Sequence, residues 1–155
     1  MRELYRTPLF PDAHRFPCAL GPADIEARIP HRPPMRLVDG LTAIDADGQR
    51  VAGFRDVDAS DPLLAGHFPG NPLYPGVLQL EAMGQLALCL SRDDELAPRI
   101  VRVVDARFLA PVAAGVRLEL QATVVASDPF LERIAGQAWV DGVLCSATIM
   151  EVYLA

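Results

Sequence analysis

Hydrophobic residues follow one helical pattern and several strand-like patterns along the chain. Residues 77–90 (VLQLEAMGQLALCL) place apolar side chains on nearly every face of a helix, and Leu, Ala, Met and Gln are good helix formers. At about 1.5 Å per residue, the segment predicts a helix roughly 20 Å long. Because none of its faces is consistently polar, we expect this helix to be buried on most sides.

Runs rich in Val, Ile and Leu, separated by turn residues, predict strands elsewhere in the chain. About six strands are expected, at residues 35–44, 49–57, 100–108, 116–126, 131–140 and 143–153. Asp141-Gly142, between the last two runs, is a strong signal for a two-residue type I′ hairpin, and residues 45–48 predict another turn. Residues 61–76 carry four prolines and three glycines, so no regular element is expected there.

Mostly antiparallel strands and one helix that is apolar all round predict an α+β fold in which the sheet wraps around the helix. A chain of 155 residues is the size of one domain. The first 24 residues contain four prolines and no sustained periodicity, so we interpret residues 1–24 as an arm laid over the surface or partly disordered. Residues 25–155 then form the single domain.

Charge and cysteine content narrow the classes of function. The chain has 20 acidic residues and 14 basic ones, all of them arginine, so its formal net charge is −6. This negative charge disfavours binding to nucleic acid or to anionic membranes. The chain lacks the apolar run of a signal peptide, and its longest apolar stretch is too short to span a bilayer, so a cytoplasmic protein is expected. No disulfide framework, metal site or cofactor is predicted, because the few cysteines and histidines lack the required spacings; they are Cys18, Cys89, Cys145, His14, His31 and His67.

Three neighbouring features suggest proton chemistry. Glu81 lies within the apolar helix, where a carboxylate needs a donor, a rim of solvent or an arginine partner. His67 lies in a segment stiffened by prolines, which would preserve the aim of its imidazole. Gly76 stands at the expected helix start, where free N–H groups could bind a carbonyl oxygen. The set suits proton abstraction next to a carbonyl, although each residue taken alone also fits a structural role.

These residues belong to a longer string that resembles the β-hydroxyacyl-acyl-carrier-protein dehydratases of the FabZ type. Its centre is HFPGNP at residues 67–72, PGV at 75–77 and EAMGQ at 81–85. The resemblance continues upstream through IPHRPPMRLVD (29–39) and downstream through DARF (105–108), and it spans roughly residues 25–153. It implies the hotdog fold, in which an antiparallel sheet wraps around one long helix. It also implies a homodimer, with assembly into hexamers left open.

The resemblance further implies a hydro-lyase that acts on 3-hydroxyacyl thioesters of acyl carrier protein and yields trans-2-enoyl thioesters. His67 of one protomer would remove the C2 proton, and the Gly76 N–H would stabilise the developing enolate. Glu81 of the other protomer would protonate or orient the departing 3-hydroxyl. An acyl tunnel would be lined by Tyr74, Leu78 and Met83, each of which is also a candidate for plain core packing.

Some positions depart from the family pattern. Pro33 and Met35 replace usual aromatic residues, and Gly40 stands where arginine commonly occurs. These changes leave the reaction intact but put chain-length preference in question, and they open the alternative of polyene or polyketide assembly in place of housekeeping fatty-acid synthesis. Two other functions remain as alternatives: a hotdog thioesterase in which Glu81 activates water, and a non-catalytic subunit that binds acyl carrier protein.

The negative charge of the chain matters for the implied partner, because acyl carrier proteins are themselves acidic. Docking would therefore need a local cluster of arginines, since salt screens charge beyond about 8–10 Å. We name Arg99, Arg102 and Arg107 as docking candidates; a solvated strand face would explain each of them equally well.

Overall fold

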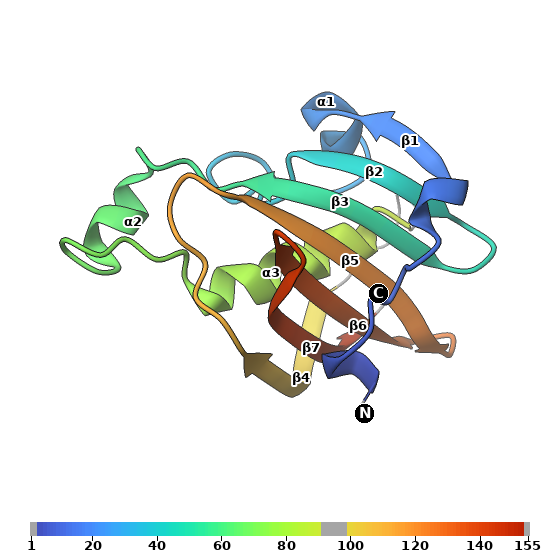
Figure 1. Ribbon diagram of the computed structural model, residues 1–155. Coiled ribbons are helices and arrows are strands. Elements are labelled where there is room, and N and C mark those ends of the chain that lie inside the picture. Colours follow the sequence, from blue (N-terminus) through green and yellow to red (C-terminus); the bar gives the residue numbers. More distant parts are fainter. Residues whose placement is uncertain (1–2, 91–98, 154–155) are drawn as a thin grey trace.

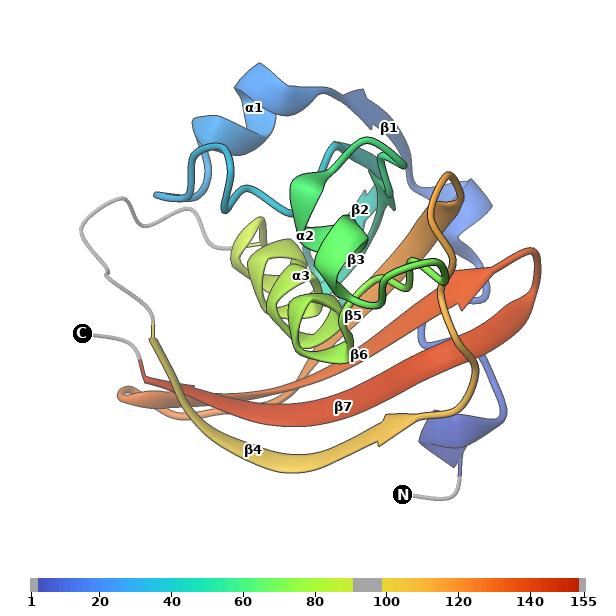
Figure 2. The same cartoon turned by 90° about the vertical axis from the view of Figure 1, so that its left-hand side faces the viewer.

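A seven-stranded antiparallel sheet curves around one long helix in the computed structural model, which describes residues 3–90 and 99–153 (Figures 1 and 2). The strand order is β1-β2-β3-β5-β6-β7-β4. The strands are β1 (Pro17–Leu20), β2 (Gly40–Asp45), β3 (Arg50–Asp56), β4 (Arg99–Phe108), β5 (Arg117–Ser127), β6 (Leu131–Val140) and β7 (Val143–Tyr153). The long helix is α3 (Gly76–Leu88), and the sheet's concave face packs against it.

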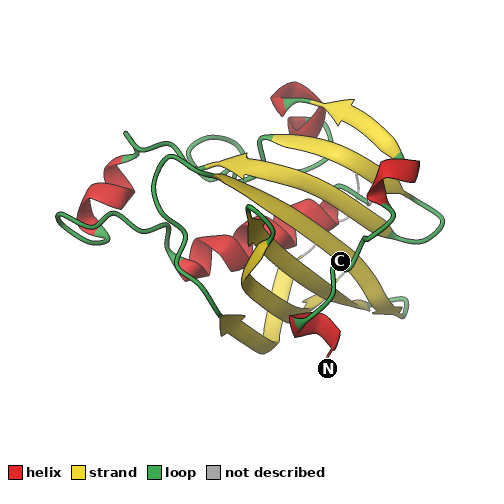
Figure 3. Cartoon of the chain, viewed as in Figure 1, coloured by secondary structure: helices red, strands yellow, loops and turns green. Residues whose placement is uncertain are grey.

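The remaining helices are short, as Figure 3 makes plain. They are η1 (Glu3–Tyr5), η2 (Ala13–Arg15), α1 (Pro22–Glu26) and α2 (Pro62–Gly66). Among the described residues, no helix is long and apolar enough to cross a membrane.

The predicted long helix and the four strands after residue 98 are confirmed almost to the residue. The residues of the Asp141-Gly142 turn have φ angles of +48° and +77°, as a type I′ hairpin requires. The burial of α3 is also confirmed, because Ala82, Met83 and Leu86 have no exposed surface. A helix with apolar residues on most faces is thus placed where the sheet can cover it.

Three details of the prediction were wrong. The strand expected from Met35 begins only at Gly40, because the Met35 carbonyl and the Leu37 N–H bond to the side chain of Gln85 instead of to a neighbouring strand. Strand β1 was missed, since its four residues are too few to show a strand period in the sequence. Helix α2 was missed as well, although Asp61 caps it through Leu63 N at 2.9 Å and Pro62 occupies its first turn.

The N-terminal arm lies across the outer face of the sheet before it joins the sheet as β1 (Figure 1). Leu4 and Phe10 are buried there against alanines of β2, β3, β6 and β7. The side chain of Gln137, itself fully buried, donates to the carbonyls of Leu4 and Thr7 at 2.6 and 2.8 Å. Specific hydrogen bonds therefore hold the described part of the arm in one place.

Strand β4 forms one edge of the sheet and pairs only with β7 among the described strands. Its apolar side chains are unusually exposed: Ile100, Val101, Val103 and Val104 are each between 38% and 56% accessible. An edge strand with an open ladder and an apolar surface is a template for pairing with another chain.

Candidate active site

His67 follows directly after α2, and its ring is oriented by the backbone of its own loop. The Nδ1 atom lies 3.0 Å from the Leu73 carbonyl, and the Leu73 N–H donates to the His67 carbonyl at 2.7 Å. Because a carbonyl only accepts, the proton of the neutral ring is on Nδ1. This leaves the Nε2 lone pair free to take a proton.

The loop that carries His67 is attached to the segment after β4. Tyr74 N donates to the Val112 carbonyl at 2.8 Å, and Leu73 forms an isolated antiparallel bridge with Ala113. The ring of Phe68 stacks on His67 with a centroid separation of 4.3 Å. The Nδ1 contact and the stacked Phe68 ring therefore both restrain the imidazole.

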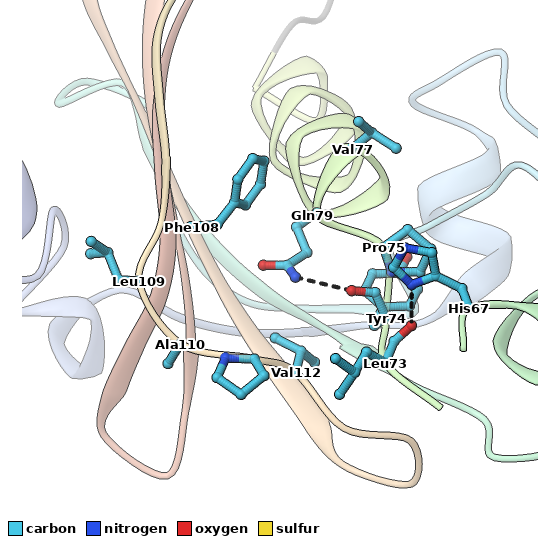
Figure 4. Close-up of a pocket in the computed structure, with 12 residues that line it drawn as sticks. His67, Leu73, Tyr74, Pro75, Val77, Gln79, Phe108, Leu109, Ala110 and Val112 are labelled. Atoms are coloured by element: carbon cyan, nitrogen blue, oxygen red, sulfur yellow. Dashed lines mark hydrogen bonds between the residues drawn. The ribbon is translucent and has the colours of Figure 1, made fainter. Parts of the chain in front are cut away.

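His67 lines a cavity of about 450 Å³, drawn in Figure 4. The α3 start contributes Gly76 to its wall, and the end of β4 contributes Phe108. The other lining residues are Leu73, Tyr74, Pro75, Val77, Gln79, Leu109, Ala110, Pro111 and Val112. His67 and the start of a helix, with its free N–H groups, thus share one cavity.

A buried polar pair fixes the start of α3 beneath this cavity. The Ser146 hydroxyl of β7 donates to Gln79 Oε1 at 2.6 Å. Gln79 Nε2 in turn donates to the Tyr74 carbonyl at 3.3 Å (Figure 4). Both side chains are almost completely buried. Because Gln79 connects β7 to the residue preceding Pro75-Gly76, the pair holds the helix N-terminus in position relative to the sheet.

Gly76 is required by close packing. A Cβ atom at this position would lie 2.5 Å from the Phe108 ring, far inside van der Waals contact. The absence of a side chain therefore lets the Phe108 ring close over the helix start and keeps the N–H groups accessible from the cavity.

We expect Gly76→Ala to lower kcat/KM by about tenfold or more, because the displaced Phe108 ring would narrow the cavity that His67 lines. The measurement is steady-state turnover together with thermal unfolding. Gly66→Ala is the matched control, since an added Cβ there has no atom within 4 Å. Equal activity of the two variants would contradict the role given to the helix start.

Glu81 lies in a second cavity, of about 330 Å³, on another face of α3. Its Oε1 accepts a hydrogen bond from Gln85 Nε2 at 2.8 Å and lies 3.4 Å from His31 Nε2. The carboxyl side chain is 28% exposed within one chain. The wholly apolar setting suggested by the neighbouring sequence is thus replaced by two polar neighbours and a partly open surface.

The structure does not bring the predicted residues together within one chain. His67 and Gly76 share the first cavity, whereas Glu81 lines the second with His31, Gln85 and Arg99. The closeness of His67, Gly76 and Glu81 in the sequence suggests a single site. However, α3 presents positions 76 and 81 on different faces, since a helix turns by about 100° per residue.

The three predicted tunnel residues differ in their surroundings. Tyr74 is 4% exposed and lines the His67 cavity, and burial raises the pKa of its hydroxyl to about 12. Met83 is completely buried in the main core against Gly136 of β6, and Leu78 packs against the same core. Neither Met83 nor Leu78 lines the His67 cavity or the Glu81 cavity.

The predicted docking arginines are spread along β4 and form no cluster. Arg99, at the start of the strand, lines the Glu81 cavity. Arg102 lies 3.7 Å from Glu151, and the guanidinium of Arg107 stacks over the Tyr5 ring at 4.2 Å, near the other end of the strand. Of the three arginines, Arg99 is therefore the one that lines the same cavity as Glu81.

Sequence reasoning missed the two polar neighbours of Glu81. Gln85 follows Glu81 by four residues, a spacing that places two side chains on the same face of a helix, and this signal was available. His31 had no such signal, because fifty residues separate it from Glu81 and only the fold brings them together.

Comparison with known proteins identifies the family of this chain. Residues 29–148 match the FabA-like domain. A 3-hydroxyacyl-(acyl-carrier-protein) dehydratase FabZ of Aliarcobacter butzleri is 38% identical over 129 residues, which cover 77% of this chain and 87% of the relative. The chain belongs to the FabZ dehydratase family. The residues of both cavities fall within the matched region, except the last residue of the second, Val152.

Solved structures establish the hotdog fold. The dehydratase heterocomplex ApeI:P from Xenorhabdus doucetiae superposes with a TM-score of 0.71 at 17% identity, covering 84% of this chain and 90% of that chain. A hot-dog-like protein from Thermanaerovibrio acidaminovorans gives a TM-score of 0.59 at 18% identity, with 70% and 82% covered. The fold implied by the sequence resemblance is confirmed. The arm, residues 1–24, lies outside the family match, which begins at residue 29.

Proposed function

We propose that this protein dehydrates 3-hydroxyacyl thioesters of acyl carrier protein at active sites that form between two copies of the chain. His67 and Gly76 of one protomer would face Glu81 of the partner subunit. The reaction class follows from membership of the FabZ family, since the relatives of this chain are named 3-hydroxyacyl-acyl-carrier-protein dehydratases. The assignment of roles and the shared site are inferred from the arrangement of the two cavities.

The observation that carries the shared site is the position of the cavities on β4. Arg99 and Ile100, at the start of this edge strand, line the Glu81 cavity, whereas Phe108, at its end, lines the His67 cavity. If β4 pairs antiparallel with β4 of a second copy about a twofold axis, the start of one strand lies opposite the end of the other. Each His67 cavity then meets the Glu81 cavity of the partner.

The same pairing would account for two features of the isolated chain. It would complete the open hydrogen-bond ladder of β4, and it would remove water from the exposed apolar side chains of that strand, such as Val101 and Val103. Glu81, which is 28% exposed in one chain, would be more deeply enclosed in the dimer.

The chemistry follows from the orientation of each group. His67 Nε2 takes the C2 proton, and the electron pair of that C–H bond forms the C2=C3 double bond as the C3–O bond breaks. Glu81 gives its proton to the departing hydroxyl, which leaves as water. The Gly76 N–H donates to the thioester oxygen while negative charge develops there, an interaction worth about 2.7–4 kcal/mol in known oxyanion holes.

Carrier-protein docking and location are parts of the same proposal. Arg99, beside the Glu81 cavity, is the best-placed of the three arginines to meet an acidic carrier protein or the phosphate of its pantetheine arm. A cytoplasmic location is supported by the three free cysteines, because cytosolic thiols are kept reduced.

The proposed function is tested by incubating the purified protein with a panel of 3-hydroxyacyl chains, attached to acyl carrier protein and to coenzyme A. Formation of enoyl thioester is followed by absorbance and identified by mass spectrometry. Release of free thiol without enoyl product would instead assign a thioesterase, and tight binding of the acylated carrier without turnover would assign a non-catalytic subunit.

Arg99→Glu should raise KM for the carrier-bound substrate about fivefold or more and change KM for the coenzyme A thioester much less, because only the carrier is a large acidic partner. Arg15→Glu carries the same change of charge on η2 of the arm, away from both cavities and from β4, and should have a smaller effect. Equal effects of Arg99→Glu on both substrates would reject a docking role for this residue.

A further inference from the structure

Glu81 is held through one of its two oxygens. Gln85 donates to Oε1 at 2.8 Å, and His31 Nε2 lies 3.4 Å from the same atom. The Gln85 side chain is itself fixed, because its amide also donates to the Met35 carbonyl and its Oε1 accepts from Leu37 N, each at 2.8 Å. Among the described residues, no hydrogen bond to Oε2 is made, so this oxygen is the one left for a ligand.

His31 is placed on this oxygen by the loop before β2. Arg32 donates from one guanidinium nitrogen to the carbonyls of Ile29 and His31, at 2.9 and 2.8 Å, which fixes the backbone on both sides of His31. The His31 Nδ1 atom is buried and has no hydrogen-bond partner among the described residues. A proton on Nδ1 would therefore have no acceptor, whereas a proton on Nε2 has Glu81 Oε1 3.4 Å away.

We infer that His31 is a positioning residue for the carboxyl group of Glu81: with Gln85 it fixes Oε1, so that Oε2 serves the 3-hydroxyl group of the substrate. This inference rests on the proposed function, since it gives Glu81 the role of proton donor. As the proton leaves Oε2, negative charge spreads onto Oε1, where the Nε2–H of His31 and the amide of Gln85 stabilise it.

Other charged groups also face this site. Arg99 of β4 lines the Glu81 cavity, and His67 of the partner subunit would lie across the substrate in the proposed dimer. Arg99 and Gln85 stay unchanged when His31 is substituted, so a change in the pH dependence of turnover reports on His31 itself.

The experiment compares three substitutions in the full-length protein. His31→Phe keeps a ring of similar shape without a donor, His31→Gln carries an amide N–H near the position of Nε2, and His31→Asn is too short to place its amide there. We expect kcat to fall about ten- to hundredfold in the Phe and Asn variants with little change in KM, because the polar contact at Oε1 is lost where negative charge develops. The Gln variant should retain most of the activity.

The pH–rate profile separates positioning from general structural damage. Removing the polar contact at Oε1 disfavours the negative charge that develops there, so the alkaline limb of kcat should move to higher pH in the Phe and Asn variants. In the Gln variant the limb should stay where it is in the wild type.

A double variant tests whether His31 acts through Glu81. In a Glu81→Gln background, His31→Phe should cause little further loss, because the carboxyl that it positions is already absent. Multiplicative losses, or an unmoved alkaline limb in both the Phe and the Asn variants, would overturn the inference. The proposed function fails separately, if the wild-type protein forms no enoyl product or if Glu81→Gln alone leaves turnover intact.

Discussion

His67→Ala and Glu81→Gln are each expected to lower kcat for 3-hydroxyacyl dehydration by about 10²–10⁴-fold, because each removes one of the two groups that move a proton. The alanine side chain has no base to take the C2 proton. The amide introduced by Glu81→Gln keeps the shape of the carboxyl group and its contact with Gln85, but it has no acidic proton to give to the leaving hydroxyl. Steady-state formation of the enoyl thioester measures both losses.

Matched controls separate these losses from effects on folding. His14→Ala removes an exposed histidine from η2 on the arm, and Glu119→Gln neutralises an exposed carboxylate on β5. Both should keep wild-type turnover, because neither residue lines the two cavities. Full activity in His67→Ala or in Glu81→Gln, with the protein folded, would contradict the roles proposed for these residues.

Mixing the two inactive variants should restore activity. In a dimer of one His67→Ala chain and one Glu81→Gln chain, one site carries both substitutions and the other carries neither, provided that each site takes its histidine and its carboxyl from different chains. Random pairing makes half of the dimers mixed, each with one intact site of two, so about a quarter of wild-type kcat should return.

A site built within one chain makes the opposite prediction. Every site of the mixed dimer would then carry one substitution, and turnover would stay at the level of the two variants. Co-expression of the chains with two different affinity tags allows the mixed dimer to be isolated, and its expected activity is about half that of the wild type, from one intact site of two. Mass measurement in solution establishes that the isolated species is a dimer.

The long helix and the strands after residue 98 could be predicted from the sequence because their signals are local. The apolar positions of residues 77–90 exclude a solvent-exposed helix, and Asp141-Gly142 can form the hairpin turn with its positive φ angles. The short elements β1 and α2 were missed, since four or five residues carry too little periodicity to be recognised without their neighbours.

The candidate site could likewise be predicted only in part. His67, Gly76 and Glu81 could be chosen from the sequence, because a stiff loop, a glycine at a helix start and a carboxyl in an apolar helix are each unusual in their local context. Their separation was expected only through the family resemblance and not from local patterns, since it depends on the direction in which α3 presents each residue and on the place of β4 at the sheet edge.

The sequence by itself therefore determined the family, the wrapped helix and the candidates for the reacting groups. The tertiary structure alone decided which groups meet. It brought His31 onto Glu81 across fifty residues, joined Gln79 to Ser146 beneath the helix start, and left an apolar edge strand with one cavity near each end. Local pattern specifies what each segment becomes, whereas contacts between distant segments exist only after the sheet has closed around the helix.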